Sequence, residues 1–466
     1  MATYPLIPKT TAHLRPGQFW SIPMADGRFG CGRVLRVDTG RPSGGRTRFI
    51  GAILDWVGDS PPASDAIAGS PVLNVGNAHV RLVSFDGGAV LGERPLAADG
   101  IVPPATVDTY WGDGYGVARV ERRFIAGDPQ PTSDFRQVST PLTDEMLRPA
   151  VTGRGVVQFD RRLTDDDFRK LGEWFRAYPE MDLRAYGSYD HSITDLEFLR
   201  FFPTLRRFAA DALWDSLTSL DGLRHLPTDL EELGIGATKV KLDLAVLSRF
   251  PELRWLFLEG QTKHLEVISG LTQLDDLTLR SITMADLSLL VPLKGLRSLD
   301  LKLGGTRDLR LLPRVGELWY LELWMIRGVT DVTAVGGISS LRSLFLQALR
   351  QVEALPDLRS ATSLRRVRLQ TMKGLRDLRP LATAPALEAI DLIDMRHLRP
   401  EDFAPLVGLP NLKAVTPGLG SRRSNEAASA LLGLPPVRTA DDWSKPTMAT
   451  RYVDSARRRV GESPSL

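Results

Sequence analysis

Few side chains in this 466-residue sequence have the spacing that a catalytic or metal-binding group would require. The histidines show neither of the H-x-x-x-H and H-E-x-x-H spacings that place two ring nitrogens on one face of a helix. No G-x-x-x-x-G-K-[S/T] phosphate loop and no G-x-S-x-G nucleophile turn occurs. We therefore expect a protein that is not an enzyme, with no catalytic residues, no cofactor and no metal site. The six histidines are His13, His79, His191, His225, His264 and His397.

Three other features have a simpler structural explanation than a chemical one. Cys31, the only cysteine, lies in a strand pattern without a histidine nearby in the sequence, so we expect an inert thiol. The glycine-rich segment 112–116 lacks the G-x-G-x-x-G spacing, and we expect a loop that leads into a strand. The run Asp165–Asp167 is expected in the first turn of a helix, where negative charge complements the helix dipole.

Composition and charge exclude several classes of protein. Lys and Arg number 59 against 56 Asp and Glu, a net charge of +3, whereas binding to nucleic acid needs a concentrated basic face. No apolar run approaches the roughly 18 residues of a membrane helix, and the N-terminus has no apolar core of secretory length. A single cysteine excludes an internal disulfide and fits a reducing compartment. We therefore expect a cytoplasmic protein that binds neither nucleic acid nor a membrane.

The elements that would carry any binding site are indicated by a repeat of the form L-x-x-L-x-L. Its copies follow one another at intervals of 21 to 25 residues. In each copy the leucines would point inward from one short strand, and stacked units would bury one continuous core. We expect about eleven such units over residues 183–419, with a parallel sheet on the concave face of a solenoid. The clear copies begin at Leu230, Leu253, Leu274, Leu296, Leu318, Leu341, Leu364 and Leu387, and the weaker ones at Leu183, Leu205 and Leu412.

This repeat resembles the bacterial leucine-rich repeat of the internalin-like type, and the resemblance implies a solenoid. That family usually carries Asn near the ninth position of the unit, where its side chain satisfies the turning backbone. This chain has no such Asn ladder, so we expect the turns to be satisfied in another way. The ninth positions hold Gln261, Ile282, Gly304, Ile326, Leu349, Met372 and Met395.

Different sequence flanks the repeats on both sides. Residues 143–182 are expected to form an N-terminal helical cap, with a helix over 163–178 that begins with the Thr164-x-x-Asp167 pattern. Residues 420–466 are expected to form a C-terminal cap, centred on 425–432, and a basic tail. The polar segment 127–142 is expected to be a linker.

Residues 12–126 carry no leucine repeat and are expected to form a small, mostly β domain. Short β-type runs alternate there with glycine-containing turns. The expected strands are residues 19–24, 29–37, 48–57, 79–85, 89–96 and 117–125.

The segment from Gly17 to Leu35, GQFWSIPMADGRFGCGRVL, resembles the opening of the immunity protein 26 family. Two strands are expected to pair through the turn at Asp26 and Gly27, with Gly30 and Gly32 allowing close approach. The resemblance implies a role in bacterial toxin–immunity systems, in which the domain binds and neutralises a toxin. Met24 stands where the family has Leu.

The outward positions of the repeat strands are the candidate binding surface. Five aromatic residues fall at positions that should face solvent, and one Glu and two Arg occupy outward positions beside them. Trp, Tyr and Arg are common in interface hot spots. The expected partner-binding residues are Trp255, Phe257, Tyr320, Glu322, Trp324, Phe345, Arg366 and Arg368. The alternative is that the rings only cover neighbouring strands.

Two functions from different classes follow from these expectations. In the first, the chain is a non-catalytic interaction protein of the toxin–immunity kind, and its partner is another protein such as a bacterial toxin or effector. In the second, the β domain is an enzyme or a small-molecule-binding module that the repeats direct to a target. The lack of a paired nucleophile and base favours the first.

Overall fold

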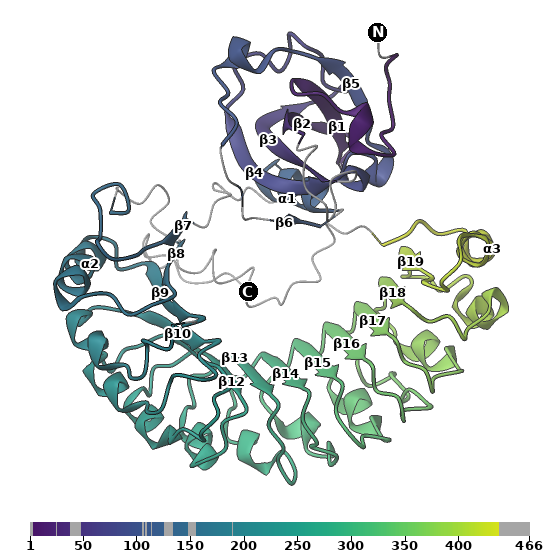
Figure 1. The fold of residues 1–466 in the computed structure, drawn as a ribbon. Helices are drawn as coiled ribbons and strands as arrows, with labels where there is room; N and C mark the ends of the chain where they lie inside the picture. Colours follow the sequence, from purple (N-terminus) through teal and green to yellow (C-terminus); the bar gives the residue numbers. More distant parts are fainter. Residues whose placement is uncertain are drawn as a thin grey trace, which may run out of the picture. The chain divides into compact units, whose positions relative to one another are not determined.

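The computed structural model describes residues 3–24, 26–37, 48–104, 107, 110–112, 114–124, 134–147, 155–188 and 190–437. The chain divides between Thr132 and Ser133 into two compact units. The N-terminal unit is built on an antiparallel sheet and the C-terminal unit on a long parallel one (Figure 1). This confirms the expected fold class, a small and mostly β domain followed by a leucine-rich-repeat solenoid.

The N-terminal unit contains a six-stranded sheet in the order β5-β1-β2-β3-β4-β6. All neighbours pair antiparallel except β4 and β6. Helix α1 (Tyr115–Phe124) contacts β1, β2 and β3, and its Val117 and Val120 are buried in the same core as Trp20 and Phe49. The strands are β1 (Gln18–Pro23), β2 (Phe29–Arg36), β3 (Arg48–Gly58), β4 (Val72–His79), β5 (Val90–Glu93) and β6 (Tyr110–Trp111). The 3₁₀ helices are η1 (Thr11–His13), η2 (Val80–Leu82), η3 (Phe85–Gly87) and η4 (Leu96–Asp99).

The β1–β2 hairpin forms as the sequence predicts. Its strands pair from Phe19 with Arg33 to Pro23 with Phe29, and Gly27 in the turn has φ +85°. The close approach at Gly32 is made by a ring, because a Cβ there would lie 2.1 Å from Trp20 Cζ2.

We expect Gly32→Ala to destabilise the N-terminal unit by about 1–3 kcal/mol. The added methyl would overlap the Trp20 indole, which is fully buried and packs edge-on against Phe49 with a centroid distance of 5.7 Å. Urea unfolding followed by tryptophan fluorescence measures the effect. Gly112→Ala is the matched control, since a Cβ there meets nothing within 4 Å. Equal stability of the two variants would contradict this packing.

Two of the expected strands in this unit are wrong. Residues 79–85 were expected to be extended, but the strand ends at His79, whose side chain accepts a hydrogen bond from the Arg81 amide (3.1 Å) and starts η2. Residues 117–125 were expected to form a strand, but helix α1 occupies 115–124. The apolar Val117, Val120 and Phe124 recur at helical spacing, and burial of that face outweighs the strand preference of valine. The loop at Gly112 therefore leads into a helix.

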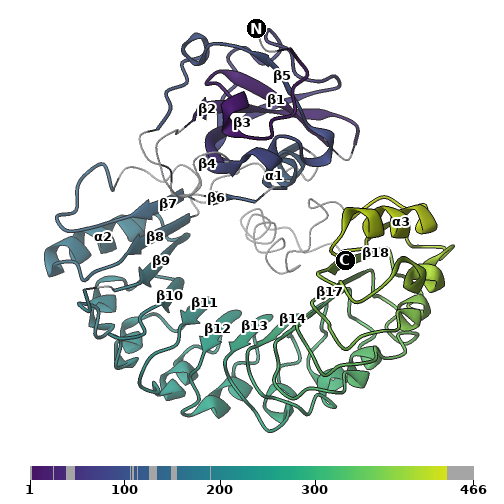
Figure 2. The same cartoon turned by 45° about the vertical axis from the view of Figure 1, so that its right-hand side comes forward.

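The C-terminal unit is a solenoid with thirteen parallel strands, β7 to β19, stacked in chain order. The strands line the inner side of its arc, and short helices and turns form the outer side (Figure 2). The first strands are β7 (Asp134–Gln137), β8 (Gly155–Phe159), β9 (Met181–Tyr186), β10 (Arg207–Asp211), β11 (Glu232–Ile235), β12 (Trp255–Glu259) and β13 (Asp276–Arg280). The others are β14 (Ser298–Lys302), β15 (Tyr320–Trp324), β16 (Ser343–Gln347), β17 (Arg366–Gln370), β18 (Ala389–Ile393) and β19 (Ala414–Thr416).

The 3₁₀ helices of this unit are η5 (Glu197–Phe201), η6 (Asp221–His225), η7 (Leu244–Arg249), η8 (Leu265–Gly270) and η9 (Ser288–Leu290). They continue with η10 (Leu312–Arg314), η11 (Thr333–Gly337), η12 (Arg379–Thr383) and η13 (Pro400–Leu406). No helix in the described ranges has both the length and the apolar character needed to cross a membrane.

The leucine repeat predicts the strands correctly from β10 to β19. The weak copy at Leu183 is out of register, because Leu183 pairs with Phe208, the fourth position of the next unit, and β9 begins at Met181. In the unit that begins at Leu296, the strand runs from the third to the seventh position, and Leu296, Leu299 and Leu301 are buried. One apolar core continues through the unit from Val138 to Leu432.

The array begins earlier than expected. β7 and β8 pair parallel ahead of β9, so residues 134–137 of the expected linker belong to the sheet, while residues 127–133 lie outside the described residues. Helix α2 (Asp165–Ala177) forms as predicted and lies in the chain between β8 and β9, within the expected cap 143–182. At the other end, α3 (Arg422–Leu432) follows β19, and the tail from residue 438 lies outside the described residues.

Both predicted features of α2 are present. The Thr164 hydroxyl accepts a hydrogen bond from the Asp167 amide (3.1 Å), and the acidic run occupies the first turn. Asp167 is also buried, where it accepts hydrogen bonds from the Thr140 hydroxyl (2.6 Å) and the Leu142 amide (3.0 Å). This run therefore has structural roles.

The turn after each repeat strand is made largely by the backbone. The eighth position of each unit from β12 to β18 has a positive φ between 50° and 69°. The backbone amide of this residue donates a hydrogen bond (2.7–2.9 Å) to the carbonyl of the last strand residue of the next unit, as seen at Ser281, Leu303, Met325, Ala348 and Thr371. The ninth position, where the Asn ladder is missing, is buried in each of these units, and in five of them an apolar side chain there belongs to the core. Gln261 is different, because its side chain bonds Gly236, Thr238 and Leu242. The eighth positions are Gly260, Ser281, Leu303, Met325, Ala348, Thr371 and Asp394.

We expect Met325→Val to lower the free energy of unfolding by about 1–2 kcal/mol, because a β-branched residue is strained at positive φ. Met325 has φ 50° and is 39% exposed, so little packing is lost by the change. Met325→Leu, which is not β-branched, is the control and should unfold like the wild type in a thermal melt. An equal loss in both variants would assign the effect to packing.

Candidate functional site

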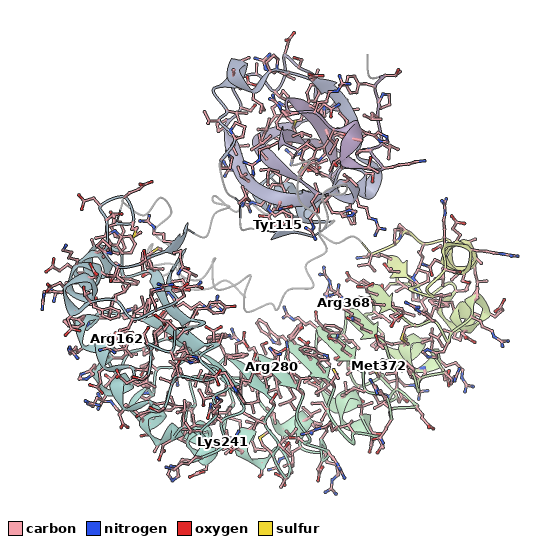
Figure 3. The ribbon with its side chains drawn as sticks, viewed as in Figure 1. Tyr115, Arg162, Lys241, Arg280, Arg368 and Met372 are labelled. Atoms are coloured by element: carbon pink, nitrogen blue, oxygen red, sulfur yellow. The ribbon has the colours of Figure 1, made fainter. Side chains whose placement is uncertain are left out.

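The inner sheet surface of β12–β17, called here the concave face, is the candidate site. The third, fifth and seventh positions of each unit point away from the leucine core, because side chains alternate along a strand. Parallel pairing then places equivalent positions beside each other, as in the row Thr278, Asp300, Glu322 and Phe345. Figure 3 shows Arg280 and Arg368 on this inner side of the arc.

Six of the eight predicted binding residues are partly exposed on the concave face. Trp255 and Phe257 stack on each other from β12, with ring centroids 6.4 Å apart and planes within 16°. Phe345 lies under the guanidinium of Arg368, 5.5 Å from the ring centroid, and Arg368 bonds Asp391 on β18 (2.8 Å). The six are Trp255, Phe257, Trp324, Phe345, Arg366 and Arg368.

The other two predicted residues are buried, so their expected exposure is wrong. Tyr320 is 5% exposed and Glu322 is 6% exposed. The Tyr320 hydroxyl donates to Glu322 Oε2 (3.1 Å), and its third-position neighbours, Ser298 and Ser343, are small and leave room for the ring. Outward side chains converge on a concave surface and cover one another there.

Two residues that the prediction did not include connect the aromatic positions. Arg280 on β13 and Lys302 on β14 both lie by the Trp324 ring, at 5.7 Å and 6.0 Å from its centroid. Arg280 also pairs with Glu259 at the end of β12 (3.1 Å). Arg280 and Lys302 could have been identified from the sequence, because each occupies the seventh position of its repeat unit. The strand register places the seventh positions side by side in one row, which contains Glu259, Arg280, Lys302 and Trp324.

The centre of the concave face is acidic and buried. Asp276 and Asp300 are fully buried, and Asp300 accepts a hydrogen bond from the Thr278 hydroxyl (2.9 Å). Lys302 Nζ lies 2.9 Å from Glu322 Oε2 and 3.5 Å from Asp300 Oδ1. Burial and the adjacent Asp300 raise the pKa of Glu322 to about 7, although Lys302 acts in the opposite direction.

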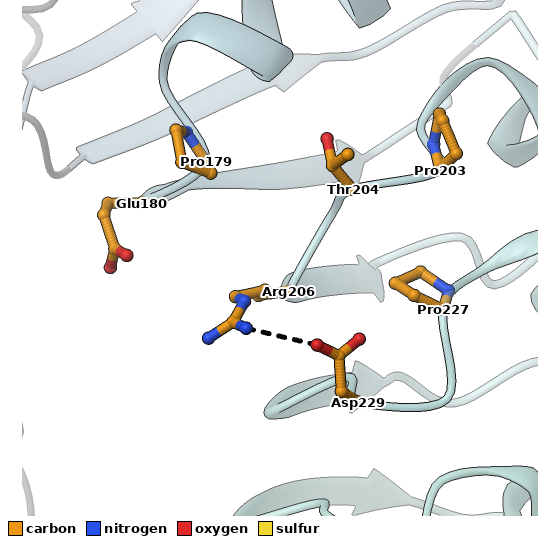
Figure 4. Close-up of a pocket in the computed structure, with 7 residues that line it drawn as sticks. All are labelled: Pro179, Glu180, Pro203, Thr204, Arg206, Pro227 and Asp229. Carbon is orange, nitrogen blue, oxygen red and sulfur yellow. Dashed lines mark hydrogen bonds and ion pairs between the residues drawn. The ribbon is translucent and has the colours of Figure 1, made fainter.

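A pocket of about 450 Å³ lies at the turns that precede β9, β10 and β11 (Figure 4). Its three charged residues are already paired, because Arg206 bonds Asp229 (3.1 Å) and Glu180 bonds Arg207 (3.0 Å), so they do not point to a ligand. The lining residues are Pro179, Glu180, Pro203, Thr204, Arg206, Pro227 and Asp229.

The cysteine and several histidines have structural surroundings. Cys31 is fully buried, and burial raises its pKa, which keeps the thiol protonated at neutral pH. His225 bonds Glu197 (3.0 Å), His264 bonds Asp243 (2.6 Å) and His397 bonds the Leu375 carbonyl (2.6 Å). In the part of the chain that the structure describes, no three His, Cys, Asp or Glu side chains are grouped to hold a metal ion.

Comparison with known proteins finds likeness only among solved structures. No family model matches the chain, so the resemblance to the immunity protein 26 family receives no support, and no curated protein matches it either. An internalin (inlF) from Listeria monocytogenes is 18% identical with a TM-score of 0.39, over 59% of this chain and 82% of that one. Internalin C2 from the same organism is 22% identical with a TM-score of 0.30, over 47% of this chain and 83% of that one.

Proposed function

We propose that this protein is a non-catalytic interaction protein whose concave face binds a protein partner. The observation that carries the proposal is the set of partly exposed rings of Trp255, Phe257, Trp324 and Phe345 on one continuous sheet. Aromatic anchors with charged neighbours are typical of the centre and rim of protein interfaces. A sheet that presents them already ordered lowers the entropic cost of binding.

The finer part of the proposal is that the partner is a bacterial toxin or effector and that the protein acts in the cytoplasm. The sequence from Gly17 to Leu35 and the hairpin that this segment forms support the kind of partner, and the single cysteine supports the compartment. The described residues of the N-terminal unit offer no observation that favours the alternative of an enzyme or a small-molecule module.

The test begins with the partner, captured on the full chain from the source organism and identified by mass spectrometry. We expect Trp255→Ala combined with Trp324→Ala to weaken its binding at least roughly thirtyfold, since a buried aromatic anchor contributes about 2 kcal/mol or more. Calorimetry measures the affinity. Tyr320 is not replaced, because it is buried and its loss would act on folding.

Trp214→Ala is the matched control, because Trp214 is 53% exposed and lies after β10, outside the concave face. This variant should bind as the wild type does. Unchanged affinity of the double variant, with a normal circular dichroism spectrum, would remove the concave face from the binding model and leave the N-terminal unit as the candidate.

A further inference from the structure

The centre of the concave face carries more acidic than basic side chains. The outward positions of β12–β15 hold four carboxylates and two cationic groups. Asp276, Asp300 and Glu322 come from three adjacent strands, which lie about 4.8 Å apart. All three side chains are buried, so water screens the negative charge of Asp276 and Asp300 less than it would at a surface, while the raised pKa of Glu322 keeps that carboxyl partly protonated near pH 7.

A second observation at the same place points to a ligand. Ser298 lies on β14 between Asp276 and Tyr320, at an outward position. Its hydroxyl is fully buried and makes no hydrogen bond with any residue that the structure describes. An unsatisfied buried hydroxyl destabilises the folded protein, so a bound group that hydrogen-bonds with it would recover this loss.

The side chains around Ser298 indicate which kind of ligand group could bind there. The described carboxylates are not grouped to hold a metal ion. The rings of Trp255, Trp324 and Phe345 are partly exposed, while the carboxylates are buried. The buried Tyr320 lies beside Ser298 on the next strand, so the ligand must reach past aromatic side chains. An arginine fits both conditions, since its guanidinium has five N–H donors in one plane, bonds carboxylates in pairs and stacks on aromatic faces.

We propose that the centre of the concave face binds an arginine side chain of the protein partner, with Asp276, Ser298 and Asp300 as acceptors. This inference rests on the proposed function and names the chemistry that the partner brings. The acidic centre would also attract a basic segment before contact, so binding should weaken as salt is raised.

The direct test titrates the full-length protein with a synthetic peptide, Gly-Ser-Arg-Arg-Arg-Ser-Gly, acetylated and amidated at its ends. Calorimetry should show binding that falls at least tenfold when citrulline replaces the three arginines, because citrulline keeps the shape and loses the charge. Asp276→Asn should also reduce affinity about tenfold, the equivalent of one charge-assisted hydrogen bond. Asp331→Asn, at an exposed acid away from the face, is the matched control.

Ser298→Ala tests the site without changing its charge. It should leave the thermal melt unchanged or raise it, because the unsatisfied hydroxyl is removed, and it should weaken the arginine peptide about threefold or more. An unchanged affinity in both Asp276→Asn and Ser298→Ala would overturn the proposal, as would a lysine peptide that binds as tightly as the arginine one.

Two further arms separate the possible failures. The chain has its own arginine run, Arg457–Arg459. If the peptide bound only to the variant R457Q/R458Q/R459Q, the chain's own arginines would be the groups that occupy the site in the wild type. That result would overturn the proposal that the site binds an arginine of the partner. A partner whose binding falls in the Trp255 and Trp324 double variant but not in Asp276→Asn would retain the proposed function and overturn only the arginine site.

Discussion

Leu299→Ala should lower the free energy of unfolding by about 2–5 kcal/mol, the usual cost of emptying a leucine site in a packed core. Leu299 is fully buried on β14, where it lies between Leu277 of β13 and Leu321 of β15. Since each unit of a solenoid is stabilised by its neighbours, the cavity should weaken the array on both sides. Urea unfolding followed by circular dichroism measures the loss.

The control for this variant is Leu431→Ala in α3, because Leu431 is 43% exposed and the same atoms are removed. Leu344→Ala on β16, two strands from Leu299, should reproduce the large effect. If Leu299→Ala unfolded with the wild type while Leu344→Ala did not, the packing at β14 would be looser than described.

Glu322→Gln should stabilise the protein at pH 8 by on the order of 2–3 kcal/mol and have little effect near pH 4. The groups that face Glu322 are Asp300, Lys302 and Tyr320, and burial with Asp300 raises the pKa of Glu322 from 4.5 to about 7. Between these values the folded protein retains a proton that the unfolded chain has lost. The stability of the wild type therefore falls as the pH rises from about 4.5 to about 7, and glutamine removes this dependence.

Urea unfolding at a series of pH values between 4 and 8.5 measures the difference between the two proteins. Glu317→Gln, at an exposed position, controls for the change of residue type. A constant difference between Glu322→Gln and the wild type across this range would show that the carboxyl does not titrate there. A lower stability of the variant at pH 8 would show that the ion pair with Lys302 outweighs burial.

The leucine repeat was sufficient to predict the solenoid strands from β10 to β19 because each inward position is buried in the same way in these units. Leu299 could be assigned to the core from its place in the pattern alone. β7 and β8 were missed because their sequences, DFRQ and GVVQF, lack the leucine spacing. β8 joins the sheet by pairing with β9, and β7 joins it by pairing with β8. This pairing depends on tertiary contacts that local sequence does not contain.

The exposure of side chains on the concave face was predicted only in part, and the reason is geometric. Position in the repeat identified which side of the strand each residue occupies, and Trp255 and Arg368 do lie on the concave face. It did not give the exposure of Tyr320, because exposure depends on the size of the neighbours that the register places beside it, Ser298 and Ser343. The same limit applies to Lys302, whose contacts with Glu322 and Trp324 follow from the stacking of strands that are far apart in the sequence.

The single buried cysteine has a practical consequence for measuring the shape of the solenoid. Because Cys31 is the only thiol and is inaccessible, a cysteine introduced elsewhere could be labelled selectively in the native protein. The exposed eighth positions Ser281 and Asp394 follow β13 and β18, five strands apart, which corresponds to about 24 Å in a straight stack. Spin labels at this pair would therefore report on the curvature of the array in solution, with distances that depart from this value as the sheet bends.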